Sequence, residues 1–402
     1  MALLHLLKCA LDFSPDAGVM LRAVTVDHGL RAASAEEARQ VHHWCRVIGI
    51  EHETLRWDGE KPESGLQAAA RQARYRLLGE AAARHGAIAI LTGHTLDDQV
   101  ETVAMRSSRS RQPHAPGLSG MAKATLLDRR HWILRPFLGS SRSELRHWLA
   151  GRGIAWLEDP SNENNAFERV RLRRETKGSA TGHHALEILE AGRERQARAE
   201  ELAAFIGSRA RLEQAAVFVL ETGGGEPALT RRATAVLATL AGGGSFLPDA
   251  AASARLEAFL ADDGQRRITI ARALIEKTTD RVYVCREYRG LPSLRVEAGS
   301  TGCWDRRFVI DNRARKAVTV VPSVEDDRAF PEACDDVPAL IRRAAMRSRP
   351  MVAGPAFQGQ IAIERRIGLY DTFLPVFDLT LANALARLVG REAFVEPPVH
   401  PV

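Results

Sequence analysis

The sequence lacks a long hydrophobic run and lacks any close pair of cysteines. Its longest apolar runs, such as AIAILT at 87–92, are far shorter than the roughly 20 residues that a membrane helix needs. The five cysteines lie far apart, with no C-x-x-C pair, which argues against a disulfide framework and against a zinc site. These absences predict a protein of the reducing cytoplasm without a membrane partner.

The chain also lacks an N-cap residue and a preceding strand for its first predicted helix. The leucines of MALLHLLKCALDF (1–13) recur at helical spacing. No Ser, Thr, Asp or Asn caps this pattern and no strand comes before it. A signal peptide is not indicated, because Lys8 and His5 interrupt the apolar pattern and no small-residue cleavage site follows. The sequence therefore leaves open what should precede this helix.

Length, apolar content and charge predict several domains and a polyanionic partner. A chain of 402 residues exceeds the size at which one core usually stops growing. Apolar residues make up 45% of it, enough for more than one core. The net charge of +6 comes mostly from arginine, which favours a polyanion as partner.

Strand and helix patterns alternate along the first hundred residues. The strand patterns cover 19–26, 51–57 and 87–92. The helix patterns cover 34–48, where Ser34 and Glu37 form a capping box, then 65–86 and the segment from Leu96. This alternation predicts βαβ units and an α/β fold, with a parallel sheet covered by helices on both faces.

Two of the predicted strands end in polar motifs. The first ends in DHG (27–29) and the third runs into GHTLDDQVET (93–102). Ligands of open parallel sheets bind outside the carboxyl ends of the strands, so both motifs should lie at one rim. The helical spacing lets Glu101 share a face with either Asp97 or Asp98. Acidic residues at a helix start are common for structural reasons alone, but clustered carboxylates here would also suit Mg²⁺ with nucleotide phosphates, or an amino substrate.

Six motifs of the N-terminal half occur together in one known family. They are VDHGLRAASAEEA (26–38), GLQAAARQARYRLL (65–78), LTGHTLDDQVETVAMR (91–106), GLSGM (117–121), LRPFL (134–138) and WLEDPSNENNAFERVRLR (156–173). In order and spacing the chain resembles the tRNA(Ile)-lysidine synthases, which are N-type ATP pyrophosphatases of the PP-loop superfamily. The resemblance is dense over 1–175 and weak beyond.

The resemblance implies an ATP-dependent ligase. ATP would adenylate the C2 oxygen of the wobble cytidine in the isoleucine tRNA with a CAU anticodon, releasing pyrophosphate. The ε-amine of free L-lysine would then displace AMP and leave lysidine. The implied fold over 1–175 is adenine nucleotide alpha hydrolase-like, and the implied ligands are ATP, Mg²⁺, lysine and the tRNA. The oligomeric state stays open, with a homodimer as one option.

The family motifs also imply roles for single residues at the third strand. Asp98 and Glu101 would hold the lysine ammonium group. His94 and Asp97 would support the reacting centre, with Asp97 as the metal ligand. All four are therefore candidate catalytic residues.

At the first strand and the long helix, the resemblance implies a nucleotide pocket. Asp27, His28 and Gly29 would line it. Arg71 and Arg74 of the helix at 65–86 would reach the phosphates, although a solvated helix face explains these two arginines equally well.

Beyond residue 175 the residue patterns predict a helical linker over 176–220 and a small α+β region over 221–402 that binds the tRNA body. Within it, RITIARALIEK (267–277) and RVYVCRE (281–287) have the pattern of a strand pair. At the domain edge, four arginines form a candidate tRNA-binding patch: Arg169, Arg171, Arg173 and Arg174. A solvated linker is the alternative explanation of this patch.

Two departures from the family pattern lead to further expectations. In the family, a first strand and an S-G-G-x-D-S loop, which cradles the ATP phosphates, directly precede a helix much like 1–13. We therefore expect Met1 to be an internal methionine of a longer protein, the first strand to be missing, and residues 1–402 alone to release no pyrophosphate. The alternative is a catalytically inactive tRNA-binding remnant, which an in-frame stop codon directly upstream would favour.

The second departure is SSRSRQPHAP (107–116), where the family has a glycine-rich loop. Its composition suggests a pair of compensating frameshifts, which resequencing of the DNA would test. A tRNA thiolase of the same superfamily is a third alternative for the function. It is disfavoured because Cys9 and Cys45, the thiols nearest to the motifs, lie in no matching motif.

Overall fold

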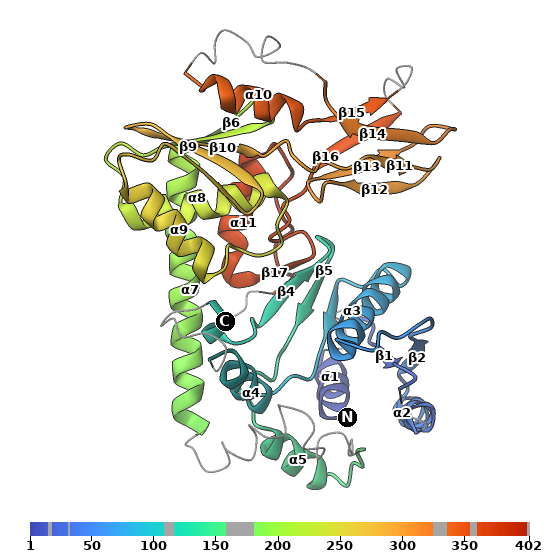
Figure 1. Cartoon of the computed structure of the whole chain (residues 1–402). Coiled ribbons are helices and arrows are strands. Elements are labelled where there is room, and N and C mark those ends of the chain that lie inside the picture. The colour runs from blue at the N-terminus through green and yellow to red at the C-terminus, as the bar shows by residue number, and fades with distance from the viewer. Residues whose placement is uncertain are drawn as a thin grey trace. The chain divides into compact units, whose positions relative to one another are not determined.

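The computed structural model describes residues 1–14, 18–30, 33–107, 116–157, 181–324, 336–353 and 360–399. The chain divides into two compact units, one formed by Met1–Arg195 with Glu396–Val402 and the other by Gln196–Val395. The division falls inside the long helix α7 (Thr181–Arg209), drawn in green in Figure 1. No helix in the described ranges has the length and hydropathy to cross a membrane.

The first unit begins with a parallel strand pair between two helices. Its elements are α1 (Ala2–Asp12), β1 (Arg22–Asp27), α2 (Ser34–Val47), β2 (Glu51–Arg56) and α3 (Leu66–Arg84). β1 and β2 run parallel in one register from their first to their last residues. Val26 and Leu55 point to α3, where they pack against the buried Trp57, Ala73 and Leu77. The predicted strands, helices and parallel pairing are confirmed here.

The next part of this unit adds a mixed sheet. This sheet contains the strands β3 (Ala89–Leu91), β4 (Ala124–Leu127) and β5 (His131–Leu134). The helices of the same part are α4 (Leu96–Ser107), the short 3-10 helix η2 (Pro116–Ser119) and α5 (Arg142–Ala150). β3 pairs with β5 in parallel, and β4 pairs with β5 antiparallel. Tyr75 of α3 packs with Leu127, Ile133 and Ile90 on this sheet. The predicted α/β class is therefore confirmed, with an antiparallel strand added.

The predicted capping box at Ser34 and Glu37 is wrong. Ala33 is the N-cap of α2, with no side-chain hydrogen bond in that role. The hydroxyl of Ser34 instead donates to Asp27 Oδ1 at 2.6 Å, so it fixes the end of β1. A capping box does occur in this unit, at Ser141 and Glu144 of α5.

The second unit contains a five-stranded antiparallel sheet. Its strands are β6 (Ala210–Glu213), β7 (Val217–Glu221), β8 (Arg267–Ile270), β9 (Ala273–Lys277) and β10 (Arg281–Arg286), in the order β6-β7-β10-β9-β8. Helices α8 (Pro227–Gly242), α9 (Ala250–Ala261) and α10 (Ala339–Arg347) belong to the same unit, and α10 packs on β7 and β10 through Ile341 and Met346.

Two predictions for this region are wrong. The helix predicted to reach residue 220 ends at Arg209, because 210–221 form the hairpin of β6 and β7. The strand predicted at 267–277 is a hairpin in itself. Its turn uses Ala271 and Arg272 at φ 50° and 65°, without a glycine or asparagine to signal it.

The rest of the second unit is a small antiparallel sandwich. One sheet contains β11 (Leu294–Val296), β14 (Val318–Pro322) and β15 (Pro350–Ala353), and the other β12 (Thr301–Trp304), β13 (Phe308–Asn312) and β16 (Ile361–Arg365). Val296, Trp304, Ile310 and Val320 form its core. The strand β17 (Phe373–Pro375), the 3-10 turn η6 (Val376–Asp378) and α11 (Leu379–Leu388) follow, so the predicted α+β character is confirmed.

One buried carboxylate joins the two parts of the second unit. Asp305 lies in the turn between β12 and β13, and its side chain is fully buried. It accepts hydrogen bonds from Arg307 Nε at 2.5 Å, from Arg286 Nε at 3.0 Å and from Arg272. Arg286 ends β10 and Arg272 lies in the turn from β8 to β9. Asp305 therefore ties the β12–β13 hairpin to the five-stranded sheet.

Candidate active site

The site is built first around the start of α4. Asp98 Oδ2 accepts hydrogen bonds from Thr95 N at 2.8 Å and from Thr95 Oγ1 at 2.9 Å, so it closes the first turn of the helix. The backbone N–H of Leu96 donates to Ser140 O at 2.9 Å. The segment between β3 and α4 is thus held by local bonds and by the chain that leads into α5.

The first residue of α5 holds both neighbouring aspartates. The backbone N–H of Arg142 donates to Asp97 Oδ2 at 2.7 Å. The guanidinium of Arg142 forms an ion pair with Asp98 at 3.2 Å. No local pattern indicates this contact, because Arg142 lies 44 residues after Asp98 and only the fold brings the two together. Glu101 lies one turn further along α4 and is 5% exposed.

His94 is uncharged at neutral pH. Burial lowers its pKa to about 4, the positive charges of Arg135, Arg71 and Arg74 act in the same direction, and Asp98 opposes them. Its Nδ1 lies 2.9 Å from Thr92 Oγ1. His94 therefore offers a neutral imidazole beside the carboxylates of α4.

The end of β1 forms the second part of the site. Asp27 Oδ1 accepts hydrogen bonds from Ser34 Oγ at 2.6 Å and from Gly29 N at 2.8 Å. The Ser34 bond, followed by the Gly29 bond, holds the pKa of Asp27 below its ordinary value. Gly29 has φ +59°, a backbone conformation that favours glycine and turns the chain back toward this carboxylate.

His28 is held by α3. Arg74 Nε and Nη2 lie 3.4 and 3.2 Å from His28 Nε2, so this nitrogen is the acceptor and the proton lies on Nδ1. Nδ1 is buried and has no hydrogen-bond partner in the described structure. The ring stands edge-on to Trp57, with centroids 5.9 Å apart. Burial and then the charge of Arg74 lower the pKa of His28.

Arg74 acts on both strand-end motifs, whereas Arg71 acts on the second. Arg74 bonds to His28 of the first motif, and its charge also acts on His94 of the second. Arg71 stacks on Tyr75, with 4.9 Å from its guanidinium carbon to the ring centroid, and its charge acts on His94 and on Arg135. Arg74 of α3 therefore acts on one histidine of each motif.

A glutamine of the third motif holds the GLSGM segment. Gln99 Nε2 donates to Met121 O at 2.9 Å, and Met121 N donates to Gln99 Oε1 at 2.6 Å. Arg106, also on α4, donates to Gly120 O at 3.0 Å. The sequence patterns did not predict this clamp. Gly120 of GLSGM is the residue that could have indicated it.

Gly120 cannot carry a side chain without strain. It has φ +63°, and a Cβ added to it would lie 2.5 Å from Gln99 Oε1. We therefore expect Gly120→Ala to lower the opening free energy of α4 by about 2 kcal/mol, from backbone strain and loss of the clamp. Hydrogen exchange of peptides covering 96–107 measures it. Gly139→Ala is the control, since nothing lies within 4 Å of its added Cβ; equal effects of the two changes would contradict the clamp.

The predicted arginine patch and the 107–116 segment lie wholly or mostly outside the described residues. Arg169, Arg171, Arg173 and Arg174 fall within 158–180, outside the described residues, as does most of the 107–116 segment. In the ranges that are described, no three His, Cys, Asp or Glu side chains are grouped so that they could hold a metal ion.

Comparisons with known proteins identify the family of the chain. A family model for the PP-loop domain matches residues 1–178. The tRNA(Ile)-lysidine synthase of Rhizobium meliloti is 41% identical and aligns with 100% of this chain and 92% of its own. That of Mesorhizobium japonicum is 38% identical, over 99% of this chain and 91% of its own. Because these alignments run through every motif of the site and on to the end of the second unit, the chain belongs to the tRNA(Ile)-lysidine synthase family.

Proposed function

We propose that the protein joins free L-lysine to C2 of the wobble cytidine in the isoleucine tRNA with a CAU anticodon, in an ATP-dependent reaction. The observation that carries the proposal is the position of Arg74, which bonds to His28 of one strand-end motif and whose charge acts on His94 of the other. Guanidinium groups suit the phosphates of ATP. The carboxylates of α4 suit the ammonium group of lysine.

In the first step, the C2 oxygen of cytidine attacks the α-phosphorus of ATP. A new O–P bond forms and the bond to the β-phosphate breaks, so pyrophosphate leaves. Arg71 and Arg74 would stabilise the charge on the phosphates, and Asp27, His28 and Gly29 would line the nucleotide side of the site. The cytidine must leave its stack for this reaction.

In the second step, lysine replaces AMP. Asp98 and Glu101 would hold the ε-ammonium group, and one of them would accept a proton from it. The lone pair of the amine then attacks C2, and the C2–O bond breaks with AMP as the leaving group. His94 adds no positive charge beside the ammonium group, because its pKa of about 4 keeps it neutral.

Asp97 is the carboxylate that we propose for Mg²⁺. Mg²⁺ typically takes one or two carboxylates and completes its shell with phosphate oxygens and water. Asp97 Oδ2 accepts one hydrogen bond, from Arg142 N, and a carboxylate has room for further partners. When bound with ATP, Mg²⁺ neutralises charge on the phosphates. The arginines of 169–174 remain our candidates for tRNA contacts.

The reaction is tested by attaching labelled lysine to tRNA. We expect the protein made from its complete gene to attach lysine to a CAU-anticodon isoleucine tRNA transcript only when ATP and Mg²⁺ are present. A transcript with a GAU anticodon, which has no wobble cytidine, should accept none. Pyrophosphate release without attached lysine, or equal labelling of both transcripts, would contradict the proposal.

A further inference from the structure

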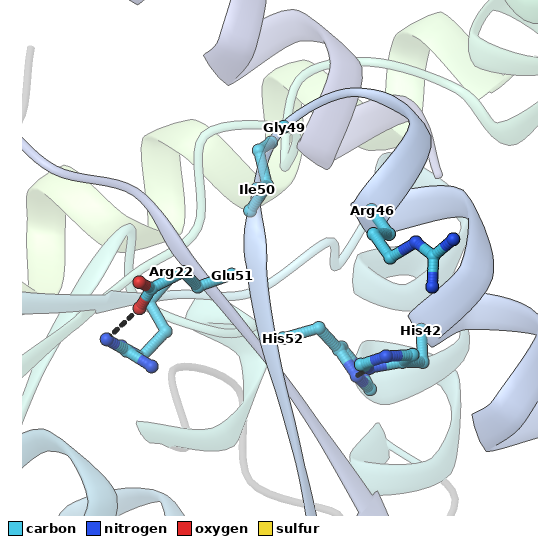
Figure 2. A pocket seen from close by; sticks show the side chains of 7 residues that line it. All are labelled: Arg22, His42, Arg46, Gly49, Ile50, Glu51 and His52. Carbon is cyan, nitrogen blue, oxygen red and sulfur yellow. Dashed lines mark hydrogen bonds and ion pairs between the residues drawn. The ribbon is translucent and has the colours of Figure 1, made fainter.

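An open polar pocket lies at the ends of β1 and β2 that are opposite to the candidate active site. The cavity is about 450 Å³ in volume, and its lining includes Arg22, His42, Arg46, Gly49, Glu51 and His52 (Figure 2). Arg22 and Glu51 begin β1 and β2, whereas Asp27 ends β1. The reaction proposed above does not use this pocket.

The pocket lies where α2 covers the strand pair, a place where apolar side chains are the rule. The face of β1 and β2 toward α3 follows that rule with Val26 and Leu55. Because side chains alternate along a strand, Thr25 and His52 point to the other face. There His52 meets His42 of α2. His42 is exposed and His52 is half-buried, so this polar edge of the contact between α2 and the strand pair is open to solvent and accessible to a ligand.

The two imidazoles contact each other. His52 Nδ1 lies 3.3 Å from His42 Nδ1, and His52 Nε2 lies 2.9 Å from Thr25 Oγ1. Burial, followed by the charge of His42, lowers the pKa of His52. Burial and the charge of His42 therefore disfavour a proton on His52, whereas an anion beside it would favour one.

The remaining charges of the pocket are mostly positive. Glu51 forms an ion pair with Arg22, and Figure 2 shows this pair apart from the imidazoles and Arg46. Arg46, four residues after His42 on α2, is exposed, and its guanidinium has no ion pair or hydrogen bond to any residue that the structure describes.

Hydrogen bonds at the end of α2 reduce the repulsion that this helix end exerts on an anion. A helix C-terminus ordinarily presents free carbonyl groups, which repel anions. Here the carbonyl oxygens of Arg46 and Cys45 accept hydrogen bonds from Gly49 N at 3.2 Å and from Ile50 N at 2.9 Å. The unpaired guanidinium and two imidazoles therefore determine which ligand fits.

We propose that this pocket binds a phosphate group, held by the guanidinium of Arg46 and by the His42–His52 pair. A guanidinium fork matches the oxygens of a phosphate, and protonated imidazoles add further N–H donors. Two sources share this chemistry: a backbone phosphate of RNA and free inorganic phosphate. Neither depends on ATP chemistry at the other end of the strands.

Inorganic phosphate is the first probe, applied to the full chain with carbon-13 in its histidine rings. At constant pH and ionic strength, we expect phosphate to shift the NMR signals of His42 and His52 saturably, where chloride does not. Arg46→Gln should weaken phosphate binding at least tenfold, and Arg46→Lys should restore part of it. Arg76→Gln is the matched control, because Arg76 is an exposed arginine of the same unit paired with Glu80 outside the pocket.

The absence of a saturable shift, or equal binding by the Arg46→Gln and Arg76→Gln variants, would overturn the proposal. Arg46 is exposed, so its replacement should leave the fold intact, and the histidine spectrum itself reports any unfolding. A tRNA transcript is the second probe. Displacement of phosphate by the transcript identifies RNA as the source, and retention of phosphate beside bound transcript identifies the free ion; both outcomes support a phosphate pocket.

Discussion

Replacement of Glu101 by glutamine is expected to raise the KM for lysine by about 10- to 100-fold, while the KM for ATP changes little. A hydrogen bond to a charged group contributes about 1.5–3 kcal/mol, and tenfold corresponds to about 1.4 kcal/mol. Glutamine keeps the size of the side chain, which is 5% exposed on α4, but removes the charge that we propose for the lysine ammonium group. The effect should therefore be specific to lysine.

The measurement is the rate of lysidine formation at varied lysine and then at varied ATP, with the tRNA saturating. Glu80→Gln is the control, because Glu80 pairs with Arg76 on the surface of α3, at 2.8 Å. It should leave both KM values unchanged. If the Glu101→Gln enzyme has the lysine KM of the wild type, the assignment of Glu101 to the lysine ammonium group has to be abandoned. If both KM values rise together, the loss is one of structure and the assignment is also unsupported.

Asp305→Asn is expected to destabilise the second unit by about 3–5 kcal/mol, the usual cost of leaving buried charges without their partner. Asp305 is fully buried, and Arg286 and Arg307 around it are each 3% exposed. Asparagine tolerates the left-handed backbone that residue 305 adopts, at φ 52°. The substitution therefore keeps the turn and removes only the charge.

Urea unfolding and hydrogen exchange of peptides covering 301–312 measure this loss. Asp311→Asn is the control, because Asp311 forms a more exposed pair with Arg313, at 2.7 Å on the neighbouring strand. Exposed pairs contribute about 0–1 kcal/mol. Equal destabilisation by the two substitutions would show that Asp305 does not hold the two parts of the unit together.

The pKa of Asp305 predicts that its contribution to the stability of the second unit is lost in acid. Burial alone would raise the pKa of Asp305, but the bonds from Arg286 and Arg307 outweigh it and hold the pKa below its ordinary value. Its stabilisation is therefore fully present above the unfolded pKa of about 3.9. It is lost as the pH falls through the lower pKa of the folded state. The difference in stability between wild type and Asp305→Asn should accordingly shrink below about pH 4.

Local patterns predicted that one strand ends at Asp27 and another just before His94. A strand's apolar run and the start of the helix that follows it are both visible in neighbouring residues. The fold class followed from the alternation of those patterns. Contacts between distant segments could not be predicted in this way. Arg142 reaches Asp98 across 44 residues, and no local pattern records it. The Gln99–Met121 clamp depends in the same way on a loop that follows α4.

The hairpin turns show a second feature that local sequence patterns could not predict. Ala271 and Arg272 adopt left-handed conformations without glycine, at some cost in strain. Bonds from Arg272 to Gly242 O at 2.9 Å and to Asp305 offset that cost. Ser34 is a third such feature. Its position predicted a helix cap, but its hydroxyl donates to Asp27 instead. In each case tertiary structure outweighs local preference.

The position of Asp305 also orders events during synthesis of the chain. Arg272 and Arg286 leave the ribosome before it, and 19 residues separate Arg286 from Asp305. At about 5–20 residues per second, this gap lasts about one to four seconds. Until Asp305 emerges, the two guanidiniums keep their water, because burying them without a counter-charge is too costly. The end of the five-stranded sheet therefore has to wait for the β12–β13 turn, and nascent chains that stop between residues 286 and 305 should leave it open to proteases.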